Sequence, residues 1–343
     1  ARSLIHLGKS EDAMALLEQV VKIREKTLPE THPSRLASQH ALAGVYQANG
    51  QVVEAVALLE QVVKIKEKTL PETHPSRLAS QHELAGAYRA NGQVVEAVAL
   101  LEQVVKIQEK TLPETHPDRL ASQHELAGVY RANGQVVEAV ALLEQVVKIR
   151  EKTLPETHPD RLASQHELAV AYQVNGQVVE AVALLEQVVK IKEKTLPETH
   201  PSRLASQHEL AGAYRANGQV VEAVALLEQV VKIEEKTLPE THPDRLASQH
   251  ALAGVYQANG QVVEAVALLE QVVKIREKTL PETHPSRLAS QHELAGAYQV
   301  NGQVVEAVAL LEQVVKIKRL KLPLSHPSRV VSENALSYLL ELI

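Results

Sequence analysis

The sequence predicts an all-α solenoid of stacked helix pairs, and three observations carry that prediction. The segment Asn-Gly-Gln-Val-Val-Glu-Ala-Val occurs seven times, with its glycines 42 residues apart from Gly50 to Gly302. Each period holds two stretches with helical apolar spacing, and no stretch alternates like a strand. A fixed period of this length is typical of units that bury their apolar faces only against their neighbours.

Each unit contains two predicted helices, described here for the unit that begins at Ser34. Helix A spans 34–48 and ends at Asn49-Gly50, residues that readily adopt the left-handed conformation at a helix end. Helix B spans 51–69, and a helix this apolar is expected to be buried on more than one side. Its apolar residues are Val52, Ala55, Val56, Leu59, Val62 and Val63, with Val53, Leu58 and Ile65 widening the stripe.

The connection to the next unit is also predicted from residue types. Leu70-Pro71 ends helix B, and Thr73 is the expected cap of the following helix A. His74-Pro75 then forms the first turn, where proline is tolerated. The core of such a unit must be built from Ala, Val and Leu with one Tyr, because the chain has no Phe, Trp or Cys.

The period divides the chain into one elongated domain, residues 1–343. We expect a partial unit at 1–33, seven full units and a C-terminal capping helix at 328–343. The full units are 34–75, 76–117, 118–159, 160–201, 202–243, 244–285 and 286–327. In the capping helix the residues expected to face the stack are Val330, Val331, Ala335, Leu336, Leu339 and Leu340.

The N-terminal piece is atypical, as terminal repeats tend to be. Only seven residues precede Gly8, and the chain begins with Ala1, so the sequence reads as a fragment of a longer protein. The shortened first helix should leave apolar surface uncovered. Weak end-to-end self-association involving Leu4 and Leu7 is the expected consequence.

These residues resemble the tetratricopeptide repeat. With Gly92 on the loop glycine of that motif, helix A supplies its Leu-small-Tyr positions and helix B its small-large-small positions. The matching residues are Leu84, Ala85, Tyr88, Ala97, Leu101 and Val104. The 42-residue length and the stretch from Lys148 to Pro159 resemble the kinesin-light-chain subtype. They resemble even more the near-identical C-terminal repeats of fungal NOD-like (NACHT or NB-ARC) receptors. The resemblance implies a right-handed superhelix of antiparallel helix pairs.

The first six full units differ from one another at only seven of their 42 positions. One column is the start of helix A (Ser34 or Asp118), and one lies in helix B (Lys66, Gln108, Arg150 or Glu234). The other five lie in helix A, at the columns of Ala41, Gly44, Val45, Gln47 and Ala48. At 100° per residue these five fall on the side of helix A opposite Leu36, Leu42, Ala43 and Tyr46.

The resemblance places that side of helix A on a concave groove, which leads to a set of candidate ligand-binding residues. Diversification of a ligand surface is one explanation of the variation, and drift at exposed positions is the other. Drift alone should also have altered the exposed residues of helix B and the loops. The candidates are His40, Gln47, His82, Glu83, Arg89, His124, Glu125, Arg131, His166, Gln173, His208, Glu209, Arg215, His250, Gln257, His292 and Gln299.

Arg89, Arg131 and Arg215 occupy one column of helix A. Arginine offers a planar, permanently charged fork for carboxylates, which predicts a ligand with acidic or carbonyl-rich segments. The alternative is pairing with the glutamates six residues earlier, although that offset does not bring side chains together on one helix face. Gly86 in mid-helix indicates either a close helix contact or an opened groove wall.

The sixteen histidines resemble a metal array at first sight. Histidines of successive helices A should lie too far apart to share an ion, and His74 and His82 are about two turns apart. We therefore expect no metal and no cofactor, with His82 as a hydrogen-bonding group. Each possible catalytic pair, such as Glu83 with Arg89, is repeated without a nucleophile or a phosphate loop. The expected protein is not an enzyme.

Composition excludes further classes. The net charge is −6 with both signs interspersed, which does not favour nucleic acid. No run of 18 apolar residues indicates a membrane span and no signal peptide is evident, so a cytoplasmic location is expected.

The favoured function is binding of a protein or peptide in the groove, as the sensor region of a fungal NOD-like receptor. A cargo adaptor like kinesin light chain is the alternative, although His82-Glu83 replaces the Asn-Asn of that family. A designed repeat without a ligand is a further alternative.

Overall fold

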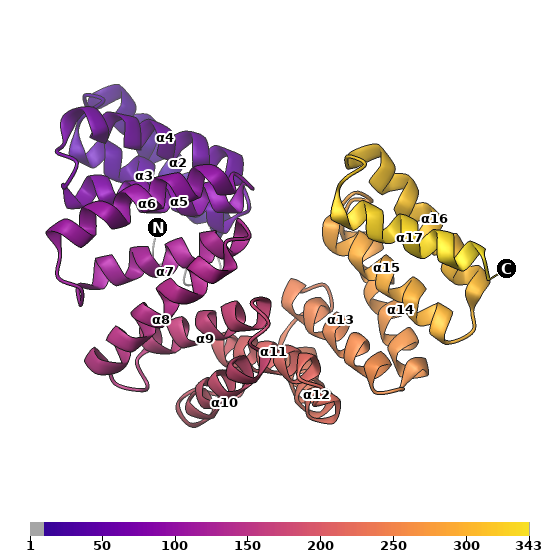
Figure 1. Ribbon diagram of the computed structural model, residues 1–343. Helices are drawn as coiled ribbons and strands as arrows, with labels where there is room; N and C mark the ends of the chain where they lie inside the picture. Colours follow the sequence, from indigo (N-terminus) through magenta and orange to yellow (C-terminus); the bar gives the residue numbers. More distant parts are fainter. Residues whose placement is uncertain (1–9, 343) are drawn as a thin grey trace. The chain divides into compact units, whose positions relative to one another are not determined.

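The computed structural model describes residues 10–342, and that range contains sixteen α-helices and no strand (Figure 1). The helices A are α3 (Pro33–Ala48), α5 (Pro75–Ala90), α7 (Pro117–Ala132), α9 (Pro159–Val174), α11 (Pro201–Ala216), α13 (Pro243–Ala258), α15 (Pro285–Val300) and α17 (Pro327–Leu340). The helices B are α2 (Ser10–Thr27), α4 (Val52–Thr69), α6 (Val94–Thr111), α8 (Val136–Thr153), α10 (Val178–Thr195), α12 (Val220–Thr237), α14 (Val262–Thr279) and α16 (Val304–Lys321). The prediction of an all-α repeat solenoid is confirmed.

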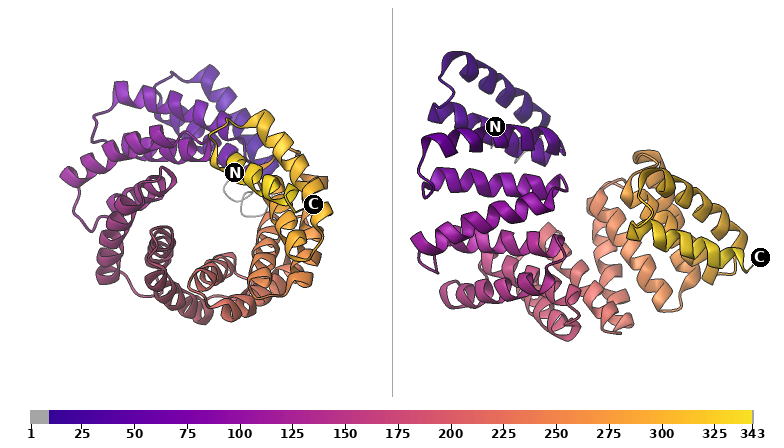
Figure 2. Two further views of the ribbon diagram at one scale, coloured as in Figure 1. Left: turned by 45° about the vertical axis from the view of Figure 1, so that its right-hand side comes forward. Right: turned by 45° about the horizontal axis from the view of Figure 1, so that its top comes forward.

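The chain divides into two compact parts, Ala1–Gly176 and Gln177–Ile343. Within each part, every helix packs against the helices before and after it in the chain. The right-hand view of Figure 2 shows the helices of the first part stacked in sequence order. The division into seven full units and two end pieces stays a prediction.

Both ends of helix A follow from local chemistry. Gly50 has a φ of 76°, which a residue with a Cβ adopts only with strain. At the other end the N-cap is His74, whose Nδ1 accepts a hydrogen bond from the backbone N–H of Ser76 at 3.1 Å. The expected cap, Thr73, is therefore wrong. The imidazole reaches the free N–H of the first turn because Pro75 begins the helix.

The core between helices is made of small and branched apolar residues, as predicted. Ala55, Leu59 and Val62 of α4 are at most 1% exposed. Val53 does not widen the buried stripe, because it is 67% exposed at the first turn of the helix. Helix B is buried on more than one side nonetheless, since α4 packs against both α3 and α5.

One of the variable columns of helix A belongs to this core rather than to the exposed side. Val45 is 2% exposed and its equivalent Ala87 is fully buried. The predicted separation of variable and core faces is wrong at this column. The column lies next to the core stripe at about 80°, and the preceding helix B packs against it, since Ala87 shares a buried cluster with Val56 and Leu59 of α4.

Hydrogen bonds between residues that recur in the units join each helix B to the next helix A. Tyr88 donates its hydroxyl proton to Glu60 at 2.8 Å, and Gln81 donates to Glu67 at 2.9 Å. Arg77 donates to the carbonyl of Leu70 at 3.2 Å. Burial, aided by the Glu60 hydrogen bond, raises the pKa of Tyr88 to about 12, so its hydroxyl stays a donor at neutral pH. These hydrogen bonds fix how each helix A is positioned along the preceding helix B.

The last helix only partly matches its predicted role. Leu339 is 1% exposed, and Ala335 and Leu336 pack against the same cluster as Leu339. Three other residues expected to face the stack are exposed instead, namely Val330, Val331 and Leu340. The expectations about Leu4 and Leu7 fall outside the described residues.

Candidate ligand-binding face

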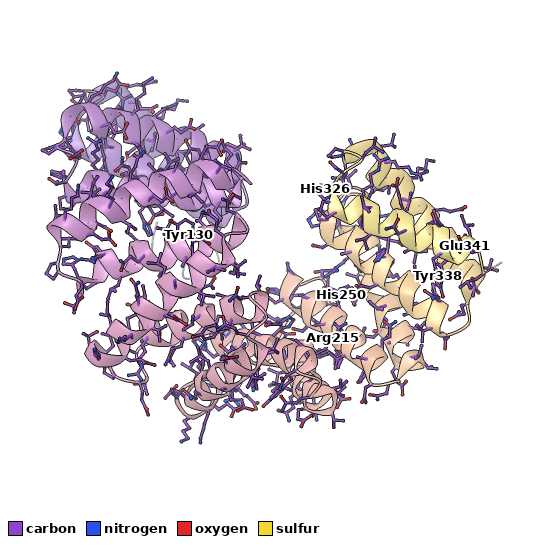
Figure 3. The ribbon with its side chains drawn as sticks, viewed as in Figure 1. Tyr130, Arg215, His250, His326, Tyr338 and Glu341 are labelled. Carbon is purple, nitrogen blue, oxygen red and sulfur yellow. The ribbon has the colours of Figure 1, made fainter. Side chains whose placement is uncertain are left out.

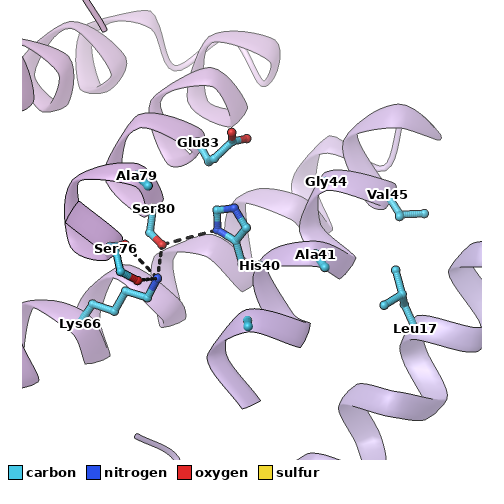
Figure 4. A pocket seen from close by; sticks show the side chains of 11 residues that line it. Leu17, His40, Ala41, Gly44, Val45, Lys66, Ser76, Ala79, Ser80 and Glu83 are labelled. Atoms are coloured by element: carbon cyan, nitrogen blue, oxygen red, sulfur yellow. Dashed lines mark hydrogen bonds between the residues drawn. The ribbon is translucent and has the colours of Figure 1, made fainter. Parts of the chain in front are cut away.

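Hollows lie between successive helices A of the first part. One, of about 500 Å³, lies between α3 and α5 and is lined by His40, Gly44 and Glu83, among others. A second, of about 530 Å³, lies between α5 and α7 and is lined by His82, Glu83 and Gln108. Figure 4 shows the first hollow with His40 near its centre. We call the surface that the helices A form along these hollows, together with the side chains at the column of Gln47 and Arg89, the groove face.

Most of the variable columns contribute residues to the lining of the groove-face hollows. Five of the seven columns supply a lining residue to one of the two hollows. These residues are Ser76 and Asp118, Ala41 and Glu83, Gly44, Val45, and Lys66 and Gln108. The variation that distinguishes the units is thus concentrated at one kind of place in the fold.

The variable residue of helix B, Lys66 in α4, also lines the first hollow of the groove face. Lys66 is 8% exposed, and its ammonium donates to Ser80 Oγ at 2.6 Å and to the Ser76 carbonyl at 2.9 Å. Ser80 Oγ lies 3.5 Å from Nδ1 of His40 on the preceding helix A. Figure 4 shows this chain of contacts. Because the ammonium only donates, the serine hydroxyl is free to donate its proton to the imidazole.

The same serine–histidine contact recurs along the chain, at His82–Ser122 (3.4 Å), His208–Ser248 (3.3 Å) and His292–Ser332 (3.2 Å). It is broken where helix B carries arginine. Arg150 donates to Ser164 Oγ, and that hydroxyl donates to the Asp160 carbonyl at 2.8 Å. Nδ1 of His124 is consequently buried without a hydrogen-bond partner.

Arg276 has the same effect in the second part. It donates to Ser290 Oγ at 2.8 Å, Ser290 donates to the Ser286 carbonyl at 2.7 Å, and Nδ1 of His250 is left without a partner. Burial lowers the pKa of both histidines, and also of His40 and His292. Burial therefore favours the neutral form of these four imidazoles.

The arginines of the groove face pair between units rather than within them. Arg89 lies 3.4 Å from Glu125, and Arg131 lies 2.6 Å from Glu167, in each case on the next helix A. The alternative considered from sequence, pairing with the glutamate six residues earlier, does not occur for these two arginines. Neighbouring helices A run alongside each other, which brings residues 36 positions apart together.

Arg215 differs from the other two. The residue 36 positions later is Ala251, and no ion pair joins Arg215 to an acidic group among residues 10–342. Figure 3 labels Arg215 on α11 and His250 on α13. Of the three arginines predicted to act alike, this one retains an uncompensated charge.

The mid-helix glycines open the groove wall. A Cβ built at Gly44 or Gly86 meets nothing within 4 Å, so close helix contact does not explain these residues. At Gly128 a Cβ would lie 2.9 Å from Nη1 of Arg89, and at Gly254 it would lie 3.0 Å from Nη1 of Arg215. Glycine there makes room for an arginine from the preceding helix A.

The remaining candidates lie on the same helices. Those that are half-buried are Gln47, His166, Gln173, Glu209, Gln257 and Gln299. Among the described residues, no group of three or more His, Cys, Asp or Glu side chains is arranged to hold a metal ion. No helix within residues 10–342 is long and apolar enough to cross a bilayer.

Two contributors were missed in the list of candidates. Lys66 and its equivalents were noticed as variable but not assigned to the groove, and Ser80 and its equivalents were not considered. The signal for Lys66 was available, because it is the single variable column in an otherwise constant helix B. No signal marked Ser80, since the serine is identical in every unit.

The opposite side of the helix pairs is uniform. Two shallow hollows in the second part, of about 390 and 370 Å³, are lined by the same ten residue types, one by Tyr256 with Glu228 and the other by Tyr298 with Glu270. None of their lining residues comes from a variable column. We call this side the outer face, and its residues serve the contacts between units.

Comparison with known proteins agrees with this architecture. The family model described as "Tetratricopeptide repeat" matches residues 1–68, 76–152, 160–236 and 244–319. The search of curated proteins found no match.

Solved structures include a similar protein with nearly identical repeats. One is a crystal structure of a Podosopora anserina protein, described as nearly identical TPR-like repeats of a kinesin light chain. It is 73% identical to this chain, and the match covers 60% of this chain and 98% of that one with a TM-score of 0.53. BtubC (BKLC) from P. vanneervenii is 17% identical over 66% of this chain and 91% of that one, with a TM-score of 0.55. A Rap protein complexed with Competence and Sporulation Factor is 12% identical over 99% and 95%, with a TM-score of 0.62. The last two show the fold alone.

Proposed function

This chain belongs to the tetratricopeptide-repeat family, and we propose that it binds a protein or peptide on its groove face, without catalysing a reaction. Members of this family generally act as non-enzymatic scaffolds for protein interactions. One observation carries the proposal for this chain. Five of the seven columns that differ between its units line the hollows of the groove face, while the hollows of the outer face are constant.

The chemistry of the hollows supports an extended ligand with its own polar groups. Each hollow combines small side chains, such as Ala79, with an imidazole, such as His82. The imidazole presents hydrogen-bonding atoms, and the small residues leave room for side chains of a ligand. The variable charged and polar residues then give each unit a different recognition surface.

At a finer level, we propose that this region is the sensor of a fungal NOD-like receptor and acts in the cytoplasm. Near-identical repeats whose differences are concentrated around the hollows of the groove face suit a surface that diversifies. The test is the coding sequence upstream of Ala1, where a nucleotide-binding domain is expected. A cargo adaptor is the second candidate, and the observation that favours it is the 73% identity to the kinesin-light-chain-like repeats. A kinesin-binding segment upstream would favour the adaptor instead.

Two matched variants test the groove face. One replaces by glutamine an exposed alanine near the start of each helix A from α3 to α15: Ala37, Ala79, Ala121, Ala163, Ala205, Ala247 and Ala289. The control replaces by glutamine an exposed alanine of each helix B from α4 to α16: Ala57, Ala99, Ala141, Ala183, Ala225, Ala267 and Ala309. Glutamine is neutral and favours helix, so both variants should fold alike.

The probe is a displayed library of random dodecapeptides selected on the wild-type chain. We expect the selected peptides to lose at least about tenfold in affinity for the groove-face variant, because its hollows are filled, and to keep their affinity for the control. Failure of the library to yield any binder, or equal loss on both variants, contradicts the proposal. Circular dichroism confirms that both variants are helical.

A further inference from the structure

Two sites of the groove face have nearly the same composition but different charge. The Arg89 site consists of Arg89, His124, Glu125, Gly128 and Arg150. The Arg215 site consists of Arg215, His250, Ala251, Gly254 and Arg276. Position by position the residues are identical except at one place, where the first site has a glutamate and the second an alanine.

The two sites also share their geometry. Each arginine lies over the glycine of the next helix A, with Nη1 at 2.9 Å from a Cβ at Gly128 and 3.0 Å from one at Gly254. In each site the arginine of helix B donates a hydrogen bond to the serine hydroxyl, and Nδ1 of the histidine has no hydrogen-bond partner. These contacts of the arginines and the histidine are therefore the same with Glu125 as with Ala251.

The Arg89 site shows where a carboxylate belongs. Oε1 of Glu125 lies 3.4 Å from Nη2 of Arg89, with the glutamate side chain 21% exposed. In the Arg215 site this place holds only the methyl group of Ala251. The guanidinium of Arg215 is exposed and keeps its full charge, because arginine is not deprotonated in proteins.

The other charges near the Arg215 site do not neutralise it. Arg276 lies beneath, 7% exposed, and donates to Ser286 and Leu246 carbonyls, so it adds positive charge. Glu293 is the acidic group near His250, but it forms no ion pair with Arg215. In the first part, Arg131 forms an ion pair with Glu167, the counterpart of Glu293. In the second part the counterpart of Arg131 is Gln257, which has no charge.

We propose that the Arg215 site binds an acidic side chain, Asp or Glu, of the protein or peptide ligand, whose carboxylate takes the place that Glu125 fills in the Arg89 site. This inference rests on the proposed function. It assigns a distinct role to one of the three groove arginines, with Arg89 and Arg131 already satisfied by carboxylates of the chain itself. A planar guanidinium next to a vacant position favours a bidentate carboxylate contact.

The test compares two peptide pools that differ at one position. Both are random dodecapeptides, one with a fixed central glutamate and the other with a fixed central glutamine. Four variants are used, and each introduces a residue that another unit carries at the same place: Arg215→Gln, Ala251→Glu, Arg89→Gln and Glu125→Ala. Retention of each pool on the immobilised full chain is measured at low salt, where charge pairs are least screened.

Wild type should retain the glutamate pool about fivefold better than the glutamine pool, as expected for a charge pair at a partly exposed site. Arg215→Gln and Ala251→Glu should both abolish that preference, the second by supplying the missing carboxylate internally. Arg89→Gln should leave it unchanged, and Glu125→Ala should increase retention by exposing a second free arginine.

The outcomes separate the two proposals. If wild type retains neither pool, peptide binding itself is wrong. If it retains both pools equally, peptide binding stands and the assignment of Arg215 is overturned. A preference that survives Ala251→Glu also overturns it. Equal competition by a single-stranded oligonucleotide would show that the site recognises phosphate rather than a carboxylate side chain.

Discussion

At the scale of single residues, the buried column of helix B couples one unit to the next. Lys192 is 5% exposed and donates to Ser206 Oγ at 2.7 Å and to the Ser202 carbonyl at 3.0 Å. Burial lowers the pKa of Lys192 from 10.5 to about 8. Among the described residues no carboxylate forms an ion pair with this ammonium, and its three hydrogen bonds stabilise the charge.

That pKa shift predicts a dependence of stability on pH. Since the folded pKa lies below the unfolded one, the unfolded chain binds more protons between about pH 8 and 10.5, and stability rises with pH in that window. We expect wild type to gain on the order of 1 kcal/mol over this range relative to Lys192→Gln, after allowance for solvent screening.

The measurement is urea unfolding of both proteins at pH 7.5, 9 and 10.5. Glutamine occurs at the equivalent Gln108, so the variant should fold, and tyrosine ionisation affects both proteins alike. A difference in unfolding free energy that does not change with pH would contradict a depressed lysine pKa.

At the scale of the element, helix A combines a packed side with an open one. Ala85 and Ala87 are fully buried, while the neighbouring Gly86 faces open space. Glycine in a helix interior lowers stability relative to alanine by roughly 1 kcal/mol. The open wall of the groove is therefore maintained at a cost in helix stability.

Two glycine substitutions test this description. Gly86→Ala should stabilise the chain by about 1 kcal/mol, because the new methyl group meets nothing within 4 Å. Gly128→Ala should stabilise it less, because Nη1 of Arg89 lies 2.9 Å from the new Cβ and must move. Thermal and urea unfolding of the two variants measure the difference, and equal stabilisation would mean that the arginine does not rest over Gly128.

At the scale of the whole molecule, the interfaces within each of the two parts repeat the same contacts. The Tyr88–Glu60 hydrogen bond recurs as Tyr130–Glu102, at 2.8 Å in both places, and as Tyr256–Glu228 in the second part. Units with equivalent surfaces are interchangeable, and stability becomes a sum over units and interfaces.

Removal of an internal unit should therefore be tolerated. Deletion of residues 202–243 joins Pro201 to Asp244. Lys192 then lies next to a helix A that has aspartate at its second position, as Arg150 does where it donates to the Asp160 carbonyl. We expect a folded, helical and slightly less stable protein, checked by circular dichroism, size-exclusion chromatography and urea unfolding. An unfolded product would refute the description of the chain as a repeat solenoid.

Much of the fold was determined by the sequence alone, because it depends on short-range chemistry. Helical apolar spacing, Gly50 and the 42-residue period predict the helix pairs and their ends to within a residue. The identity of the cap was not predictable in the same way. His74 replaces Thr73 in that role because the position of its Nδ1 depends on how Pro75 begins the helix.

The groove face needed the tertiary structure, because its contacts join residues about 36 to 40 positions apart. The sequence by itself placed Arg89, Arg131 and Arg215 in one column and gave them one role. Only the packing of consecutive helices A decided that Glu125 and Glu167 neutralise two of them, and that Ala251 leaves the third free. A periodic sequence specifies what each unit contains, whereas the charge at each site depends on which neighbour packs against it.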